Sequence, residues 1–171
     1  MQTASQGDLE DIPWPVLQLR RKPPENGGID NIKHTRIGYS TEVEMKRVLK
    51  RKHFARWQAS ERLPDTALCM AVREMESGLV DANLGGLLYK QRVARPGGGK
   101  SHGYRTLISA RVGHCYVFLH GFSKNSQENI TQDEQKALRF AGKMFLELSP
   151  EALSKALGAG ILLEIHCEQD H

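Results

Sequence analysis

The chain has little of what membrane, fibrous and disulfide-rich proteins need. It has only three cysteines in 171 residues, and no apolar run approaches the length of about 20 residues that crosses a bilayer. No apolar stretch follows the N-terminus, which argues against a signal peptide. Cys69, Cys115 and Cys167 lie far apart without a CxxC pair, so neither a zinc ribbon nor a disulfide framework is predicted. We therefore expect a cytoplasmic protein, kept in a reducing compartment and not associated with a membrane.

Charge is distributed unevenly along the chain. The net charge is +4, but residues 46–124 contain 15 basic and 5 acidic side chains, whereas the segments on both sides are net acidic. A basic block of this kind is typical of a surface that binds a polyanion such as a nucleic acid. A solvated surface rich in lysine and arginine would give the same composition, so charge alone leaves both interpretations open.

The composition changes at Met45. Residues 1–44 are rich in proline and glycine, and their apolar residues keep no sustained period. We interpret them as a disordered or loosely attached extension. The functional domain is expected to span residues 45–171, and Met45 is a candidate for its true start.

The periodicity of residues 45–171 predicts a small α+β domain, an antiparallel sheet flanked by helices. Strands are expected at 46–50, 87–94, 104–111, 115–122 and 161–165, and helices at 53–61, 64–78, 131–148 and 151–157. Pro64 is expected as the first residue of its helix. Thr131 and Glu134 have the spacing of a capping box at the start of the third helix.

Long polar side chains are concentrated on two expected strands and on the glycine-rich loop between them. They are Lys90, Arg92, Arg95, Lys100, Tyr104 and Arg105. If the two strands are neighbours, we expect these groups to converge on one basic surface that holds phosphates. Otherwise they are the charged residues that protect a strand edge.

Other polar residues lie near this block. Lys124 and Asn125 follow the next strand and are candidates for the same cleft, and His102 of the loop is a candidate for acid–base chemistry. His120 is placed equally well in the core or in a site. No three histidines have the spacing of a metal site, so neither a metal nor a cofactor is predicted.

Several motifs, in order, resemble those of RelE/HigB-type toxins of type II toxin–antitoxin systems. The matching segments, which together cover about residues 45–165, are 54–57, 67–69, 74–86, 92–97, 99–100, 103–106, 116–118 and 121–125. The resemblance implies a RelE-like fold of the microbial-ribonuclease type and a metal-independent endoribonuclease that cleaves messenger RNA, typically on the translating ribosome. It also implies an antitoxin protein that covers the basic face.

The resemblance also implies roles for individual residues. Arg92 and Arg105 would hold the scissile phosphate, and Tyr104 would stack on a base or orient the 2′-hydroxyl. Lys100 or Lys124 would stabilise the leaving oxygen. The remaining RNA-binding candidates are Lys90, Arg95, His102 and Asn125, of which His102 stands where relatives often carry glycine.

Two other functions are compatible with the same sequence. One is a ParE-like toxin that inhibits DNA gyrase, and the other is a non-catalytic basic module that binds RNA. The nuclease hypothesis requires the basic side chains to share one pocket rather than to lie on opposite sides of the molecule.

Overall fold

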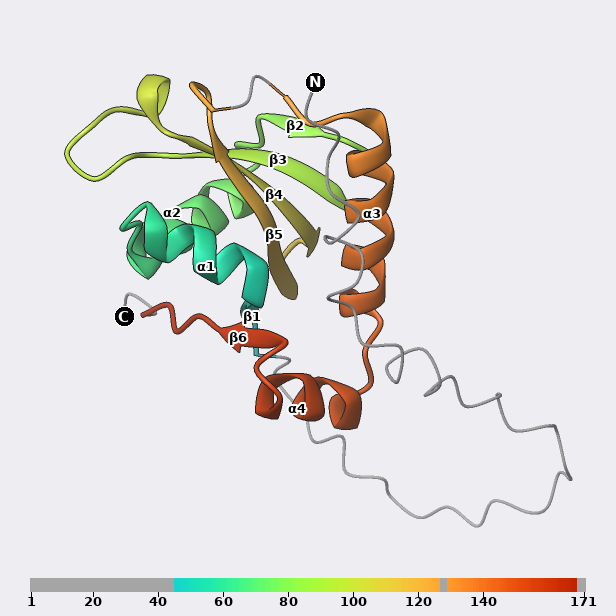
Figure 1. The fold of residues 1–171 in the computed structure, drawn as a ribbon. Coiled ribbons are helices and arrows are strands. Elements are labelled where there is room, and N and C mark those ends of the chain that lie inside the picture. The colour runs from blue at the N-terminus through green and yellow to red at the C-terminus, as the bar shows by residue number, and fades with distance from the viewer. Residues whose placement is uncertain (1–44, 127–128, 169–171) are drawn as a thin grey trace, which may run out of the picture. The chain divides into compact units, whose positions relative to one another are not determined.

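One six-stranded sheet with helices on both of its faces organises the part of the chain that the computed structural model describes, residues 45–126 and 129–168 (Figure 1). The elements are β1 (Arg47–Arg51), α1 (Lys52–Ser60), α2 (Asp65–Glu76), β2 (Ala82–Asn83), β3 (Leu88–Val93), a 3-10 turn (Lys100–His102), β4 (Tyr104–Arg111), β5 (Cys115–Ser123), α3 (Gln132–Leu146), α4 (Pro150–Gly158) and β6 (Leu162–Glu164). The extension expected over residues 1–44 lies outside the described residues and stays a prediction.

The strands are arranged in the order β2-β3-β4-β5-β1-β6. β3, β4 and β5 form antiparallel neighbours, and β6 pairs antiparallel with the outer side of β1. The predicted α+β class is confirmed, but the sheet is not wholly antiparallel, because β1 pairs parallel with β5. Two helices and three strands separate β1 from β5 along the chain, so no tight turn imposes an antiparallel pairing.

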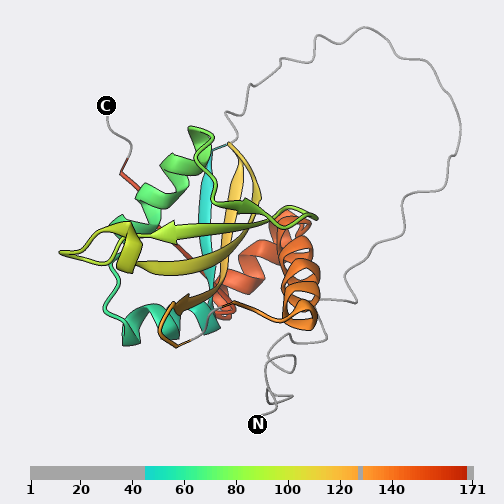
Figure 2. The ribbon, with the colours of Figure 1, turned by 90° about the horizontal axis from the view of Figure 1, so that it is seen from above.

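The two faces of the sheet bury different cores. On the face that we call the α2 face, α1 and α2 pack through Phe54 and Leu68 against residues such as Phe118. On the opposite face, the α3 face, α3 and α4 pack over Leu107 and Leu119. Figures 1 and 2 show α1 and α3 on different sides of the strands. Every residue of a strand therefore belongs to one of two separate environments.

Local sequence signals account for the starts of α3 and α4. Thr131 accepts a hydrogen bond from the backbone of Glu134, and the Glu134 carboxylate accepts one from the backbone of Thr131, which confirms the predicted capping box. Ser149 caps α4 with its hydroxyl, which accepts a hydrogen bond from the Ala152 N–H. Pro64 has extended backbone angles and is the N-cap of α2 rather than its first residue. The two-residue strand β2 was not predicted, because it is too short to show a period.

One disulfide is present, where the sequence predicted no disulfide framework and a reducing compartment. Cys69 of α2 and Cys167, after β6, are bonded across a sequence separation of 98 residues, and Cys115 is free. Spacing did not indicate this pair, because only folding brings α2 beside the C-terminal segment.

Two further properties concern the described ranges alone. None of the helices in them has the length and apolarity that a membrane crossing requires. No group of three or more histidine, cysteine or acidic side chains there is arranged to hold a metal ion.

Candidate functional site

A row of cations crosses β3 and β4 on the α3 face. Arg92 lies opposite Arg105 in the β3–β4 register, and Lys90 lies opposite Leu107, one of the core residues beneath α3. Directly opposed residues of antiparallel strands project from the same face, as do residues two apart on one strand. Lys90, Arg92 and Arg105 therefore share the α3 face, as expected from the sequence, and we call these three the basic row.

The basic row runs from Lys90, which is beside the core residue Leu107, to Arg92 and Arg105, nearer the end of β3 and β4 where the loop begins. α3 packs toward the other end, where Gly142 is so close to Ser109 that a Cβ would overlap its side chain. Arg92 is exposed and Lys90 and Arg105 are half-buried. A partly desolvated guanidinium on a rigid sheet, as at Arg105, binds phosphate more strongly than a mobile surface charge, because less entropy is lost on binding.

Asp81, just before β2, holds Arg92 in place. Its carboxylate accepts a hydrogen bond of 2.5 Å from the backbone N–H of Arg92, and its Oδ1 lies 3.8 Å from the Arg92 Nε. The ion pair is largely exposed, with 51% of the Arg92 side chain accessible, so it contributes little to stability. Its effect is to fix the orientation of the Arg92 guanidinium.

Tyr104 lies on the α2 face, away from the basic row. Its ring is 3% exposed and packs edge-on against Trp57, with 5.2 Å between ring centroids. The pKa of Tyr104 is raised, first by burial and then by a hydrogen bond to Glu61. Adjacent residues of a strand project from opposite faces, so Tyr104 and Arg105 cannot both face the same ligand. The expectation that Tyr104 shares one surface with the arginines is wrong.

The glycine-rich loop between β3 and β4 is also fastened to the α2 face. The Lys100 Nζ lies 2.5 Å from the Glu74 carboxylate of α2, which also accepts a hydrogen bond from the buried Gln91. The Arg95 guanidinium lies over the Tyr104 ring, 4.8 Å from its centroid. The expected convergence on one surface is therefore wrong for Lys100 and Arg95 as well. The six side chains do not share the single pocket that the nuclease hypothesis required, and only the basic row is left as its phosphate site.

The remaining candidates lie at the rim. Val93, Tyr104 and Ser123 are aligned across β3, β4 and β5, so the β3–β4 loop and the turn after β5 leave the same end of the sheet. His102 is exposed in that loop, which extends beyond the sheet in Figure 1, and Lys124 and Asn125 are exposed in the turn. Within the described part of the chain, no contact that we identify ties these three residues to the basic row.

Two histidines that sequence spacing did not connect lie beside the basic row. His120 of β5 is opposite Leu107 and half-buried, so it projects from the α3 face. The ring of His53, at the start of α1, stacks on it with 6.0 Å between centroids and 17° between ring planes. The sequence places His120 equally well in the core or in a site, and it indicates no role for His53. The parallel pairing of β1 with β5 is what brings the two rings together.

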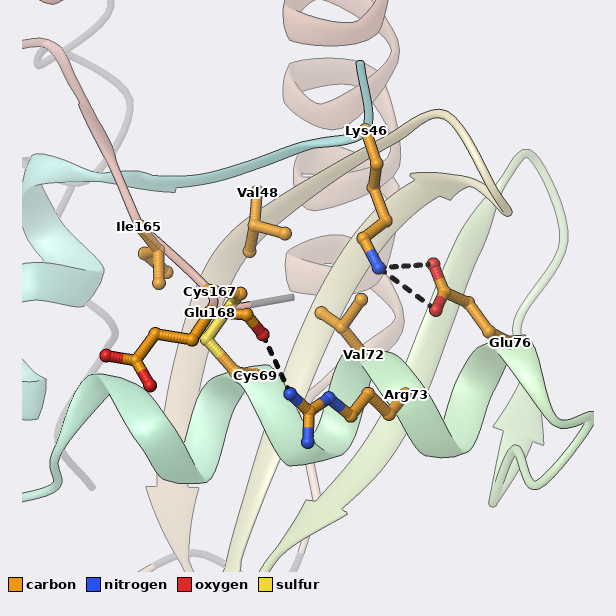
Figure 3. Close-up of a pocket in the computed structure, with 9 residues that line it drawn as sticks. All are labelled: Lys46, Val48, Cys69, Val72, Arg73, Glu76, Ile165, Cys167 and Glu168. Atoms are coloured by element: carbon orange, nitrogen blue, oxygen red, sulfur yellow. Dashed lines mark hydrogen bonds and ion pairs between the residues drawn. A yellow bond between two sulfur atoms is a disulfide. The ribbon is translucent and has the colours of Figure 1, made fainter. Parts of the chain in front are cut away.

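A pocket of about 300 Å³ lies away from the basic row (Figure 3). It surrounds the disulfide, between α2, β1 and the C-terminal segment. Its lining residues are Lys46, Val48, Cys69, Val72, Arg73, Glu76, Ile165, Cys167 and Glu168. Val48, Cys69 and Val72 belong to the core of the α2 face, so this pocket and the basic row are separate.

Comparison with known protein families matches residues 46–165 to the model described as the RelE toxin of the RelE/RelB toxin–antitoxin system. No match was found among curated proteins or among solved structures. The matched segment runs from β1 to the end of β6 and contains the whole sheet with all four α-helices. The chain therefore belongs to the RelE toxin family and is the toxin of a toxin–antitoxin system, with an antitoxin as its partner.

Proposed function

We propose that the chain is an endoribonuclease that cleaves messenger RNA in the cytoplasm, on the translating ribosome, through attack of an RNA 2′-hydroxyl on the adjacent phosphorus. The antitoxin neutralises it by covering the basic row. The observation that carries this proposal is the Arg92–Arg105 pair, two guanidinium groups directly opposed on one accessible face of the sheet in a member of the RelE toxin family.

The proposed reaction needs no metal or cofactor, because the nucleophile belongs to the substrate. The 2′-oxygen forms a bond to phosphorus and the bond to the 5′-oxygen breaks, which leaves a cyclic phosphate and a 5′-hydroxyl. Negative charge accumulates on the phosphoryl oxygens as the reaction proceeds. Arg92 and Arg105 are proposed to bind those oxygens and to hold the linkage in line for attack.

The other sequence candidates take revised roles in this proposal. Lys90 adds a third cation beside the arginines, and Lys124, Asn125 and His102 contact RNA from the rim. The burial of Tyr104 favours a supporting role for it, in which Tyr104 and Lys100 anchor the β3–β4 loop instead of touching the scissile phosphate.

The test is to incubate the purified full chain with translating ribosomes and a defined messenger RNA, and to map RNA ends by primer extension. We expect discrete cuts within codons, and a loss of at least about 100-fold in cleavage rate for Arg105→Ala, the scale for removing one transition-state donor. Arg56→Ala, on the exposed side of α1, is the matched control and should cut normally. Both variants should keep the wild-type urea unfolding midpoint, which shows that they are folded.

Two other outcomes would overturn the nuclease proposal. Intact RNA together with loss of DNA supercoiling by gyrase would identify a ParE-like inhibitor. Intact RNA, unaffected gyrase and salt-dependent binding to ribosomal RNA would identify a non-catalytic RNA-binding module.

A further inference from the structure

From the stacked pair of His53 and His120 we infer that these two side chains carry the protons of RNA cleavage, one as general base and the other as general acid. This inference rests on the proposed endoribonuclease function. The basic row supplies charge, and RNA cleavage also needs proton transfer, for which imidazole is the side chain whose ordinary pKa lies near neutral pH.

The first argument is position. His120 is two residues from Phe122, which lies opposite Arg105, so His120 is the diagonal cross-strand neighbour of Arg105 on the same face. Diagonal neighbours in a sheet are within reach of long side chains. A phosphate bound by Arg105 is therefore within reach of the His120 ring, whose centroid lies 6.0 Å from that of the His53 ring.

The second argument is an irregularity in β5. The register shifts between Leu107 and Ile108, which are opposite His120 and Phe118 respectively. The extra residue is Leu119, which packs in the core of the α3 face, so Leu119 and His120 are consecutive residues directed to the same side. Without this bulge the alternation of the strand would direct His120 to the α2 face. Bulges that redirect one side chain are frequent beside active sites.

The third argument is electrostatic. Two imidazolium groups at this separation would repel each other, which favours a neutral ring beside a charged one, the combination that a general base and a general acid require. Neighbouring cations also disfavour a second positive charge on the histidine pair. Arg51 of β1 donates from Nε to the Leu119 carbonyl, and Lys90 and Arg105 project from the same face. Arg139 of α3 does not take part, since its guanidinium binds the Leu84 and Gly85 carbonyls.

The proton transfers balance the reaction. The neutral imidazole accepts the proton of the 2′-hydroxyl as the bond from the 2′-oxygen to phosphorus forms. The imidazolium donates its proton to the 5′-oxygen as the bond from phosphorus to that oxygen breaks. The pair ends with the same number of protons, redistributed between its two rings, and exchange with water restores the starting state.

The experiment measures the pH dependence of RNA cleavage by the full chain and by His53→Gln and His120→Gln. The plot of the wild-type rate against pH should be bell-shaped, with its maximum near neutral pH. Each variant should be at least about 100-fold slower, and each should lose a different side of the bell-shaped profile. RNA affinity and antitoxin binding should stay within about twofold of wild type. His114→Gln, in the exposed turn between β4 and β5, is the matched control and should keep both the rate and the bell.

A second substrate separates proton transfer from structural damage. RNA with sulfur in place of the 5′-oxygen at the cleaved bond needs no general acid, because a thiolate leaves without a proton. One of the two variants should recover most of its rate on this RNA and the other should not. Equal behaviour of the two variants, or a variant that keeps the wild-type bell, would overturn the inference.

The same measurements show whether the histidine inference or the proposed endoribonuclease activity has failed. If the wild-type chain cuts no RNA, the proposed function fails. If it cuts RNA at a rate that does not change between about pH 5 and 9, the nuclease stands and the histidine pair is excluded, even where neither variant folds.

Discussion

Reduction of the Cys69–Cys167 disulfide should lower the stability of the domain substantially. The bond closes a loop with a sequence separation of 98 residues, which contains β2 to β6 and therefore most of the sheet. In the chain-entropy model a loop of this length restricts the unfolded chain by about 16 cal/mol/K, or about 4.7 kcal/mol at 25 °C. We take this as an upper value, because a compact unfolded state is already partly restricted.

Native contacts around the bond explain why reduction should weaken rather than abolish the fold. The Ile165 N–H donates to the Val48 carbonyl at 2.8 Å, and an Arg73 Nη donates to the Glu168 carbonyl at 2.9 Å. These hydrogen bonds keep the C-terminal segment beside β1 and α2 when the sulfur–sulfur bond is open. We therefore expect a folded reduced protein with a lower unfolding midpoint.

The assay is urea unfolding followed by tryptophan fluorescence, with and without dithiothreitol, in a Cys115→Ala background that prevents exchange with the free thiol. The midpoint should fall by about 2 M urea if the loss is 4 kcal/mol and the slope is about 2 kcal/mol/M. The double variant Cys69→Ala/Cys167→Ala is the control, and dithiothreitol should not shift its midpoint.

Thiol titration provides an independent check. The wild-type chain, purified without reductant and unfolded, should react at one cysteine out of three. Three reactive thiols, or equal urea midpoints before and after reduction, would refute the reasoning.

Three further predictions concern the fold and the length of the active chain. Gly121→Ala should destabilise the domain by about 1–3 kcal/mol in urea, because a Cβ at Gly121 overlaps the Trp57 ring, and an unchanged midpoint would contradict that packing. Burial raises the pKa of Tyr116 to about 12, so the protonated hydroxyl contributes stability that is complete below about pH 10 and lost as pH rises toward 12. The loss is at most about 2.7 kcal/mol and should be absent in Tyr116→Phe, which urea midpoints at pH 9 and 12 would measure. A chain that begins at Met45 should still arrest growth, because the family match begins at residue 46, and loss of arrest with intact expression would assign a role to the preceding residues.

The sequence by itself determined most of the local structure. The expected strand over residues 104–111 matches β4 at both ends, and the capping box at Thr131 marks the start of α3. These features depend on residues close together along the chain, through side-chain alternation and through hydrogen bonds within one helical turn. The basic row could also be predicted, because Lys90 and Arg92 alternate on one strand and Arg105 lies on its neighbour.

Only the tertiary structure decided which polar residues share a face. Alternation along β4 places Tyr104 and Arg105 on opposite faces. Which of the two cores each face meets follows from the register of the strand with partners far along the chain. The bulge that directs His120, the stacking of His53 on it and the bond between Cys69 and Cys167 all depend on such distant pairings. Spacing within a sequence carries no information on contacts of this kind, because they form only when the sheet assembles.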